Sequence, residues 1–237
     1  MLELSNVNFS YEKGTPVLQD ISFKVEDGES VGLIGCNGAG KSTLMKVLLG
    51  LLPHEGTVKV EDLTLTKETI PEVRRKLGFV FQDSDNQMFM PTVFDDMMFG
   101  PLNYGHTREE AEHRVDEVLE ELGLTYLKNK YNHKISGGEK RMAAIATILT
   151  MRPKIILMDE PSIALDPQNR RNVINAINKL GATKIIASHD LDMILDTCTR
   201  VILMHDGKII KDAPAEEILK DKELLEANHM ELPFRLQ

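Results

Sequence analysis

The chain has no tryptophan, only two cysteines and no long apolar run. Cys36 and Cys198 lie far apart and lack metal-ligand spacing, which argues against a disulfide-stapled secreted domain and favours a reducing cytosol. The N-terminus shows no basic start followed by an apolar stretch, so we expect no signal peptide. The apolar run 155–158 is far shorter than the roughly 20 residues that cross a bilayer, so work at a membrane would need a partner.

An excess of positive charge is also missing. The 28 Lys and Arg residues stand against 37 Asp and Glu residues, which gives a formal net charge of −9. With no local basic patch in the sequence, we expect no nucleic-acid partner. A length of 237 residues with 42% hydrophobic content is enough for one substantial core, or for one core with a smaller lobe.

Apolar periodicity predicts strands that alternate with helices. This order favours an α/β fold with a mostly parallel sheet covered by helices on both faces, and an antiparallel portion near the N-terminus. Within a single domain, 1–237, we expect a core from 1–82 and 151–212, a helical lobe at 83–150 and a helical tail at 213–237. Strands are predicted at 21–25, 31–34, 56–60, 77–81, 155–158, 185–187 and 201–204, with a hairpin turn at 205–208, and helices at 42–50, 107–122, 136–150 and from 167 onward.

The strongest signal is a glycine-rich loop between a predicted strand and a predicted helix. Its sequence matches G-x-x-x-x-G-K-[ST], in which backbone N–H groups and the helix N-terminus face phosphate oxygens. Lys41 would supply a positive charge to the β and γ phosphates, and the Ser42 hydroxyl would ligate Mg²⁺. The plainer alternative is a glycine-rich turn with a surface lysine. The predicted ATP-binding residues of the loop are Gly35, Cys36, Asn37, Gly38, Ala39, Gly40, Lys41, Ser42 and Thr43.

Two adjacent acids follow a buried strand at 155–158. Unpaired carboxylates at such a strand end would be costly, so a cation is expected there. Asp159 would hold Mg²⁺ and Glu160 would accept a proton from the attacking water. The alternative is an ordinary solvent-exposed strand end.

A second helix N-terminus begins at Ser136-Gly137-Gly138-Glu139. The S-x-x-E spacing is a capping box, which needs no glycine. Two glycines in a first helical turn each sacrifice up to about 1 kcal/mol relative to alanine. The pair therefore indicates that another molecule approaches this backbone closely, and a helix N-terminus suits an anion.

Taken together, these residues resemble the ATP-binding cassette (ABC) ATPases over about residues 2–212. Ser136 to Arg141 resembles the signature motif, with Glu139 where glutamine is commoner. Further matches are the Walker B pair Asp159 and Glu160, the D-loop from Ser162 to Asp166, the switch histidine His189, the Q-loop glutamine Gln82 as a Mg²⁺ contact, and Tyr11 as the aromatic that stacks on adenine.

The resemblance implies an enzyme that hydrolyses Mg-ATP to ADP and phosphate and that works in pairs. Two cassettes close head to tail, so that the signature of one contacts the ATP held by the other, as a homodimer or as a heterodimer with a paralogue. It also implies a separate transmembrane transporter subunit, with the ATPase peripheral at the cytoplasmic face of the membrane. Each of the weaker matches also has a plainer structural interpretation. These are an edge-strand aromatic for Tyr11, a loop polar residue for Gln82, a solvated histidine for His189 and a helix N-cap for Asp166.

A narrower resemblance, to energy-coupling-factor importers and cobalt or nickel uptake ATPases, lies in 82–105. We expect the methionine- and phenylalanine-rich segment 86–105 to dock a short helix of the membrane partner, with lobe core as the alternative. Gly100-Pro101 would also stop a short helix. The cargo would be a transition metal or a vitamin. Competing functions are a soluble ABC ATPase acting on nucleic acid or the ribosome and a small-molecule kinase, which has no use for the Ser136 motif.

Overall fold

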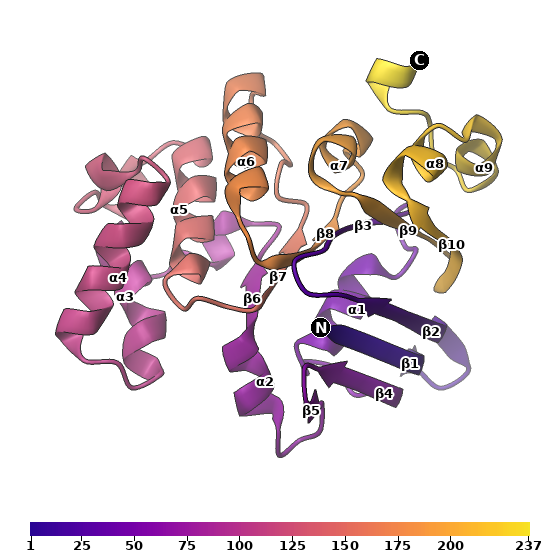
Figure 1. The fold of residues 1–237 in the computed structure, drawn as a ribbon, viewed down its shortest axis with the longest axis horizontal. Helices are drawn as coiled ribbons and strands as arrows, with labels where there is room; N and C mark the ends of the chain where they lie inside the picture. Colours follow the sequence, from indigo (N-terminus) through magenta and orange to yellow (C-terminus); the bar gives the residue numbers. More distant parts are fainter.

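The computed structural model describes residues 1–237, which form two sheets and nine α-helices (Figure 1). The N-terminal sheet is antiparallel, in the order β2-β1-β4-β5, and the central sheet has the order β10-β9-β3-β8-β7-β6. The N-terminal strands are β1 (Leu2–Glu12), β2 (Thr15–Val25), β4 (Glu55–Val60) and β5 (Leu63–Thr64). The central strands are β3 (Ser30–Ile34), β6 (Leu77–Val80), β7 (Ile155–Asp159), β8 (Thr183–Ala187), β9 (Arg200–His205) and β10 (Lys208–Pro214).

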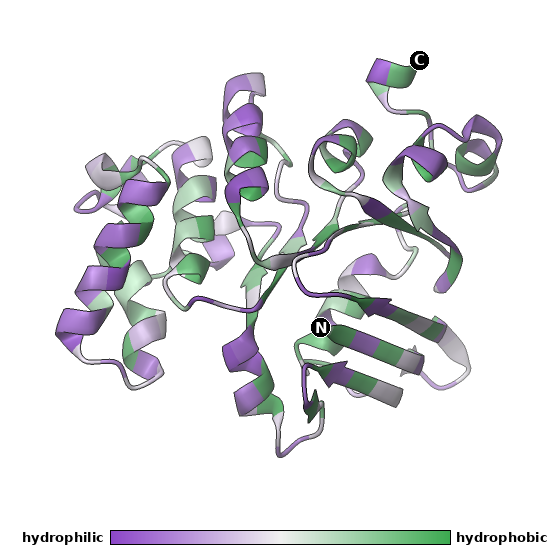
Figure 2. Cartoon of the chain, in the orientation of Figure 1, coloured by the Kyte–Doolittle hydropathy of each residue, from purple (hydrophilic) through white to green (hydrophobic).

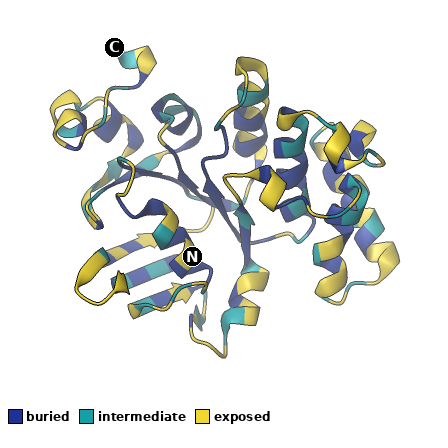
Figure 3. Cartoon of the chain, turned by 180° about the vertical axis from the view of Figure 1, so that it is seen from behind, coloured by how far each residue is buried: buried dark blue, intermediate teal, exposed yellow.

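The central sheet is parallel except for β10; its parallel strands are largely buried, whereas β10 alternates between exposed and half-buried residues (Figure 3). Successive side chains of a strand point to opposite faces, so β7 contributes to two cores. Ile155 and Leu157 pack in a cluster of 27 buried residues shared with the N-terminal sheet and α1. Ile156 and Met158 pack in a cluster of 36 buried residues to which helices α3 to α9 contribute. This confirms the predicted α/β class with its antiparallel N-terminal portion.

Helices α3, α4 and α5 stand beside the central sheet (Figure 1), within the segment 83–150 for which a helical lobe is predicted. Their apolar faces meet in a core that contains Met97, Leu119 and Ile145, and Figure 2 shows the hydrophobic stripes of α3 and α5. The helices of the chain are α1 (Lys41–Leu48), α2 (Ile70–Lys76), α3 (Val93–Asn103), α4 (Arg108–Glu121), α5 (Gly137–Leu149), α6 (Pro167–Lys179), α7 (Leu191–Thr197), α8 (Ala215–Leu219) and α9 (Lys222–Ala227). No helix is both long and apolar enough to span a bilayer.

One local prediction was wrong. Gly100-Pro101 does not stop a helix, because α3 continues through Pro101 to Asn103. Proline lacks the N–H that would bond to the carbonyl of Met97, so that acceptor is released. The Thr150 hydroxyl, at the end of α5, donates to the Met97 carbonyl at 3.2 Å. The same hydroxyl lies 2.8 Å from the Thr147 carbonyl, so this tertiary contact compensates in part for the missing N–H of Pro101.

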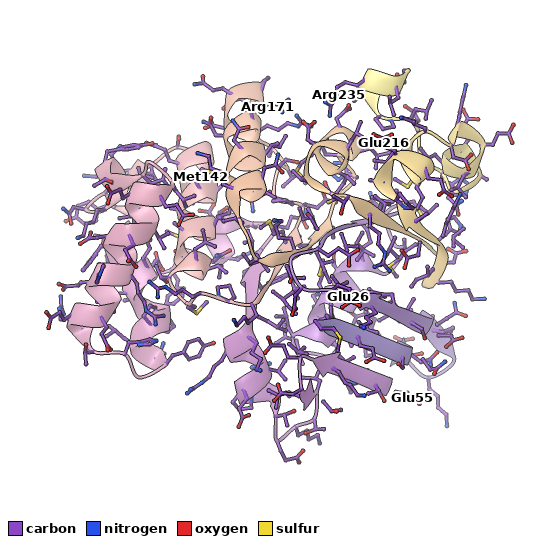
Figure 4. All side chains as sticks on the ribbon, viewed as in Figure 1. Glu26, Glu55, Met142, Arg171, Glu216 and Arg235 are labelled. Atoms are coloured by element: carbon purple, nitrogen blue, oxygen red, sulfur yellow. The ribbon has the colours of Figure 1, made fainter.

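The C-terminal segment ends in a short turn of 3₁₀ helix, Phe234–Leu236, that lies against α7. The Arg235 guanidinium donates to Asp192 at 3.0 Å and to Asp196 at 2.7 Å. Arg171 of α6 reaches the same Asp196 at 2.8 Å, and Figure 4 labels Arg171 and Arg235 on this side of the molecule. These ion pairs join the tail to α7 and join α7 to α6.

Candidate functional site

The glycine-rich loop connects β3 to α1 at the carboxyl edge of the central sheet. Gly35 has a φ of +149°, and a Cβ there would lie 2.2 Å from the Met204 carbonyl oxygen, so only glycine fits. The N-cap of α1 is Gly40, which provides no side-chain cap. The first N–H groups of α1 are therefore free to bind an anion.

Lys41 folds back over this loop. Its Nζ donates to the carbonyls of Gly35 at 2.6 Å and Cys36 at 3.2 Å, and the side chain is buried. Burial lowers the pKa of Lys41, and the nearby charges of Glu160 and Asp159 oppose that shift. A buried cation held by two carbonyls is poised to exchange them for phosphate oxygens.

Asp159 ends β7 directly beside the loop. Burial raises the pKa of Asp159, while the Ser42 hydroxyl and Lys41 act in the opposite direction. Asp159, Ser42 and Gln82 line one cavity of about 630 Å³. Their oxygen donors match the preference of Mg²⁺, which binds through few protein ligands and keeps waters and phosphate oxygens. The donor set therefore fits this ion.

Residues just after β8 hold Glu160 through two hydrogen-bond donors and a close contact of the His189 ring. Its carboxylate accepts from the Ser188 hydroxyl at 2.9 Å and from the His189 N–H at 3.1 Å, and His189 Nδ1 lies 2.9 Å from Oε2. Glu160 has a φ of +48°, which is uncommon outside glycine and typical of functional sites. Ser188 was not predicted, and its position directly after a buried strand was the one signal that could have indicated it.

The Ser136 helix start has the predicted capping box, in which Ser136 Oγ accepts from the Glu139 N–H at 3.2 Å and Glu139 accepts from the Ser136 N–H at 2.8 Å. The two positions of the pair are glycine for different reasons. A Cβ at Gly138 would lie 2.1 Å from Asn169 Cγ, so this glycine serves an internal contact. A Cβ at Gly137 would meet nothing within 4 Å, so only Gly137 leaves open backbone for another molecule.

Asp166 caps α6, as predicted. Its carboxylate accepts from the N–H groups of Gln168 and Asn169, both at 3.0 Å. Upstream, Ser162 donates to Asp190 at 3.1 Å, and Arg170 binds the same carboxylate at 2.6 and 2.7 Å. The segment that leads into α6 is thus tied to Asp190, the residue that follows His189.

The main cleft, of about 1290 Å³, brings together the whole loop from Gly35 to Thr43 with Gln82, Glu160 and His189. Ser136, Gly138, Glu139 and Asp166 do not line this cleft, and Tyr11 does not either. Tyr11 is 58% exposed, with its hydroxyl 3.4 Å from Thr43 Oγ1. The tail residues 229–235 also line the cleft, which sequence reasoning missed because their approach depends on the Arg235 ion pairs.

A phosphate-binding loop beside an adjacent carboxylate pair, at the carboxyl edge of a parallel sheet, defines a P-loop ATPase. A family model described as ABC transporter matches residues 18–163. The chain therefore belongs to the ABC transporter family, as an ATP-binding subunit that couples ATP hydrolysis to transport.

Similar proteins agree with this assignment. The energy-coupling factor transporter ATP-binding protein EcfA of Methanocaldococcus jannaschii is 42% identical, over 98% of this chain and 86% of that protein. The structure of cbiO1 from Clostridium perfringens, part of the transporter complex cbiONQ, is 34% identical over 95% of this chain and 93% of that one, with a TM-score of 0.86. The ATP-binding cassette MJ0796, a dimer with ADP and Pi, is 28% identical over 91% of this chain and 99% of that one, with a TM-score of 0.80.

Proposed function

We propose that this ATPase subunit powers an importer of the energy-coupling-factor type, whose cargo is a transition metal such as cobalt or nickel, or a vitamin. The likeness to EcfA and cbiO1 supports the importer class. The observation that carries the ATPase mechanism is the arrangement of Glu160, which is held by Ser188 and His189 at the edge of the cleft that Lys41 enters.

In this mechanism Lys41 and the N–H groups at the start of α1 bind the β and γ phosphates. Ser42, Asp159 and Gln82 would hold Mg²⁺, which neutralises charge on the phosphate oxygens. Glu160 accepts the proton of the attacking water. His189, which reaches Glu160 through both its backbone N–H and its ring, orients that carboxylate. Tyr11 stacks on adenine, since it is exposed beside Thr43.

The signature residues Ser136 to Glu139 would serve the second ATP of a dimer. Ser136 and Gly137 are exposed and do not line the main cleft, so they contact ATP only if another cassette presents it. The dimeric state of MJ0796 supports a dimer here. A homodimer and a heterodimer with a paralogue both satisfy this geometry.

The exposed face of the lobe is the proposed docking surface for the transmembrane subunit. Phe89 and Phe99 are 62% and 45% exposed, and their rings form an edge-to-face pair at 4.9 Å. By contrast, Met88, Met97 and Met98 are buried in the lobe core, so the docking role falls on the phenylalanines.

This surface is rigidly held to the lobe. The buried carboxylate of Asp96 accepts from the N–H groups of Phe89 at 3.1 Å and Met90 at 3.0 Å, and it also accepts from Asn132. Asn132 lies four residues before Ser136. A push on the Phe89 loop would therefore reach the signature helix through Asp96 and Asn132.

The decisive experiment uses Glu160→Gln. The glutamine cannot accept a proton, so general-base assistance of about 10²- to 10⁴-fold should vanish while ATP binding persists. With cleavage blocked, size-exclusion chromatography should show a monomer without nucleotide and a dimer with Mg-ATP. Adding Ser136→Arg should abolish that dimer, because the cation opposes the helix dipole and blocks phosphate. Vigorous turnover by Glu160→Gln would remove Glu160 as the base.

The alternative is a soluble ABC ATPase that acts on nucleic acid or the ribosome. Coexpression of the chain with its neighbouring genes separates the two, because only a transporter subunit copurifies with a membrane protein. Copurification with ribosomes or nucleic acid instead would overturn the importer proposal.

A further inference from the structure

The segment Phe81–Met90 carries Gln82 and joins the central sheet to the lobe. The last ladder pair of β6 is Val80 with Met158, so the segment leaves the sheet at Phe81. Beyond that point its side-chain hydrogen bonds to other elements go to the lobe, mainly to α5, and none goes to the central sheet. From Phe81 onward, these hydrogen bonds therefore attach the segment to the lobe and not to the central sheet.

Gln87 makes one half of this attachment. Its buried side chain accepts from the Phe81 N–H at 3.1 Å and donates to the Ala144 carbonyl of α5 at 2.7 Å. A single amide thus closes the loop from Phe81 to Gln87 and fastens it to the helix that begins after Ser136.

Arg141 of α5 makes the other half. Its guanidinium donates to the carbonyl of Phe81 at 2.6 Å and to the carbonyl of Gln82. Arg141 is buried, forms no ion pair, and its Nε has no hydrogen-bond partner. Burial lowers the pKa of Arg141, with only the charge of Asp83 opposing it. A buried cation with so few partners is costly, which indicates a role other than stability.

We propose that Gln87 and Arg141 are positioning residues that fix Gln82 to the signature helix, so that Gln82 and Ser136 move as one body relative to the phosphate-binding loop. Closure of the lobe would then bring Gln82 to one ATP and Ser136 to the other in a single motion. This inference rests on the roles proposed above for Gln82 and Ser136.

The test compares Gln87→Met and Arg141→Met with Asp85→Ala. Asp85 lies in the same segment and also binds α5, through an exposed ion pair with Lys140, so its loss is the matched control. We call Gln87 and Arg141 together the clamp. For the two clamp variants, Gln87→Met and Arg141→Met, we expect kcat to fall about 10-fold or more, with KM for ATP changed by less than about 3-fold, because the phosphate-binding loop is intact. Asp85→Ala should behave as wild type.

Amide hydrogen exchange provides a readout independent of turnover. In the nucleotide-free protein, exchange of residues 81–90 should accelerate in both clamp variants and stay unchanged in α1. The double variant should lose no more activity than either single one, because both residues act on one body. Arg141→Lys keeps the charge but can reach fewer acceptors, so it should be intermediate, and it carries the test if Arg141→Met does not fold.

The possible failures are distinguishable. Unchanged exchange at 81–90, or losses of activity that simply add, would overturn the clamp. Faster exchange with wild-type kcat would show that the clamp only stabilises the loop, which also overturns the positioning role. Unchanged turnover by Gln82→Ala would instead overturn the proposed role of Gln82, while the exchange result still decides whether the clamp exists.

Discussion

The two glycines at the start of α5 allow a sharp test, because the same change to alanine should have opposite consequences at neighbouring positions. At Gly138 the added methyl would lie 2.1 Å from Asn169 Cγ and 2.3 Å from its Oδ1. Asn169 can turn away only by breaking the hydrogen bond that its Nδ2 donates to Asp166 at 2.5 Å. At Gly137 the methyl would meet nothing within 4 Å.

The magnitudes follow from these distances. Overpacking at Gly138 should cost about 1–3 kcal/mol, and alanine returns up to about 1 kcal/mol of helix propensity. The net loss of about 1 kcal/mol should lower Tm by about 2–4 °C in a chain of this size. Gly137→Ala gains the propensity term without the clash, so its Tm should equal or exceed that of the wild type.

For Gly137→Ala we expect a loss of activity although the stability of the monomer is unchanged or higher. If a second subunit brings its ATP to this helix start, the methyl of Gly137→Ala obstructs it, so turnover and Mg-ATP-dependent dimerisation should fall although the monomer is stable. Calorimetry of the nucleotide-free variants, followed by ATPase assays, measures both quantities.

A double-mutant cycle of Gly138→Ala with Asn169→Ala provides the control. Removing the Asn169 side chain removes the clash, so the cycle should show a coupling of about 1 kcal/mol or more. Equal Tm values for the two glycine variants, or zero coupling in the cycle, would refute the internal contact as the reason for Gly138. Wild-type turnover by Gly137→Ala would refute the approach of another molecule.

Two further predictions concern the surface of the lobe and the loss of stability at acidic pH. Replacing Phe89 and Phe99 with serine should abolish copurification with the membrane partner and leave basal ATP hydrolysis near wild type. Met97→Ser, in the buried core, should instead unfold the lobe. If the surface variant also unfolds, these phenylalanines belong to the lobe core and not to a docking surface. Burial alone would raise the pKa of Asp190, but Arg170 holds it below its usual value, so the pair stabilises the fold above the unfolded pKa and this stability is lost as pH falls through the folded pKa. Arg170→Met should therefore flatten the loss of Tm as pH falls below about 4, the usual pKa of an unfolded Asp, and an unchanged acid profile would contradict that sign.

The parts of the site that the sequence reveals are those built from contiguous residues. The loop Gly35–Ser42, the carboxylate pair at the end of β7 and the capping box at Ser136 each depend on local backbone geometry, which a few adjacent residues specify. Their order along the chain also allowed the alternation of strands and helices, and hence the α/β fold, to be predicted correctly.

Contacts between distant residues could not be read in this way. Ser188 and His189 reach Glu160 from 28 and 29 residues away, and Gly138 owes its lack of a side chain to Asn169 on another helix. Gly100-Pro101 was predicted to stop a helix, and no local rule shows that the Thr150 hydroxyl reaches the released carbonyl of Met97 from another helix. Backbone preferences and caps are local free energies and are therefore visible in the sequence, whereas these pairings exist only because the packed sheet and helices bring the partners together.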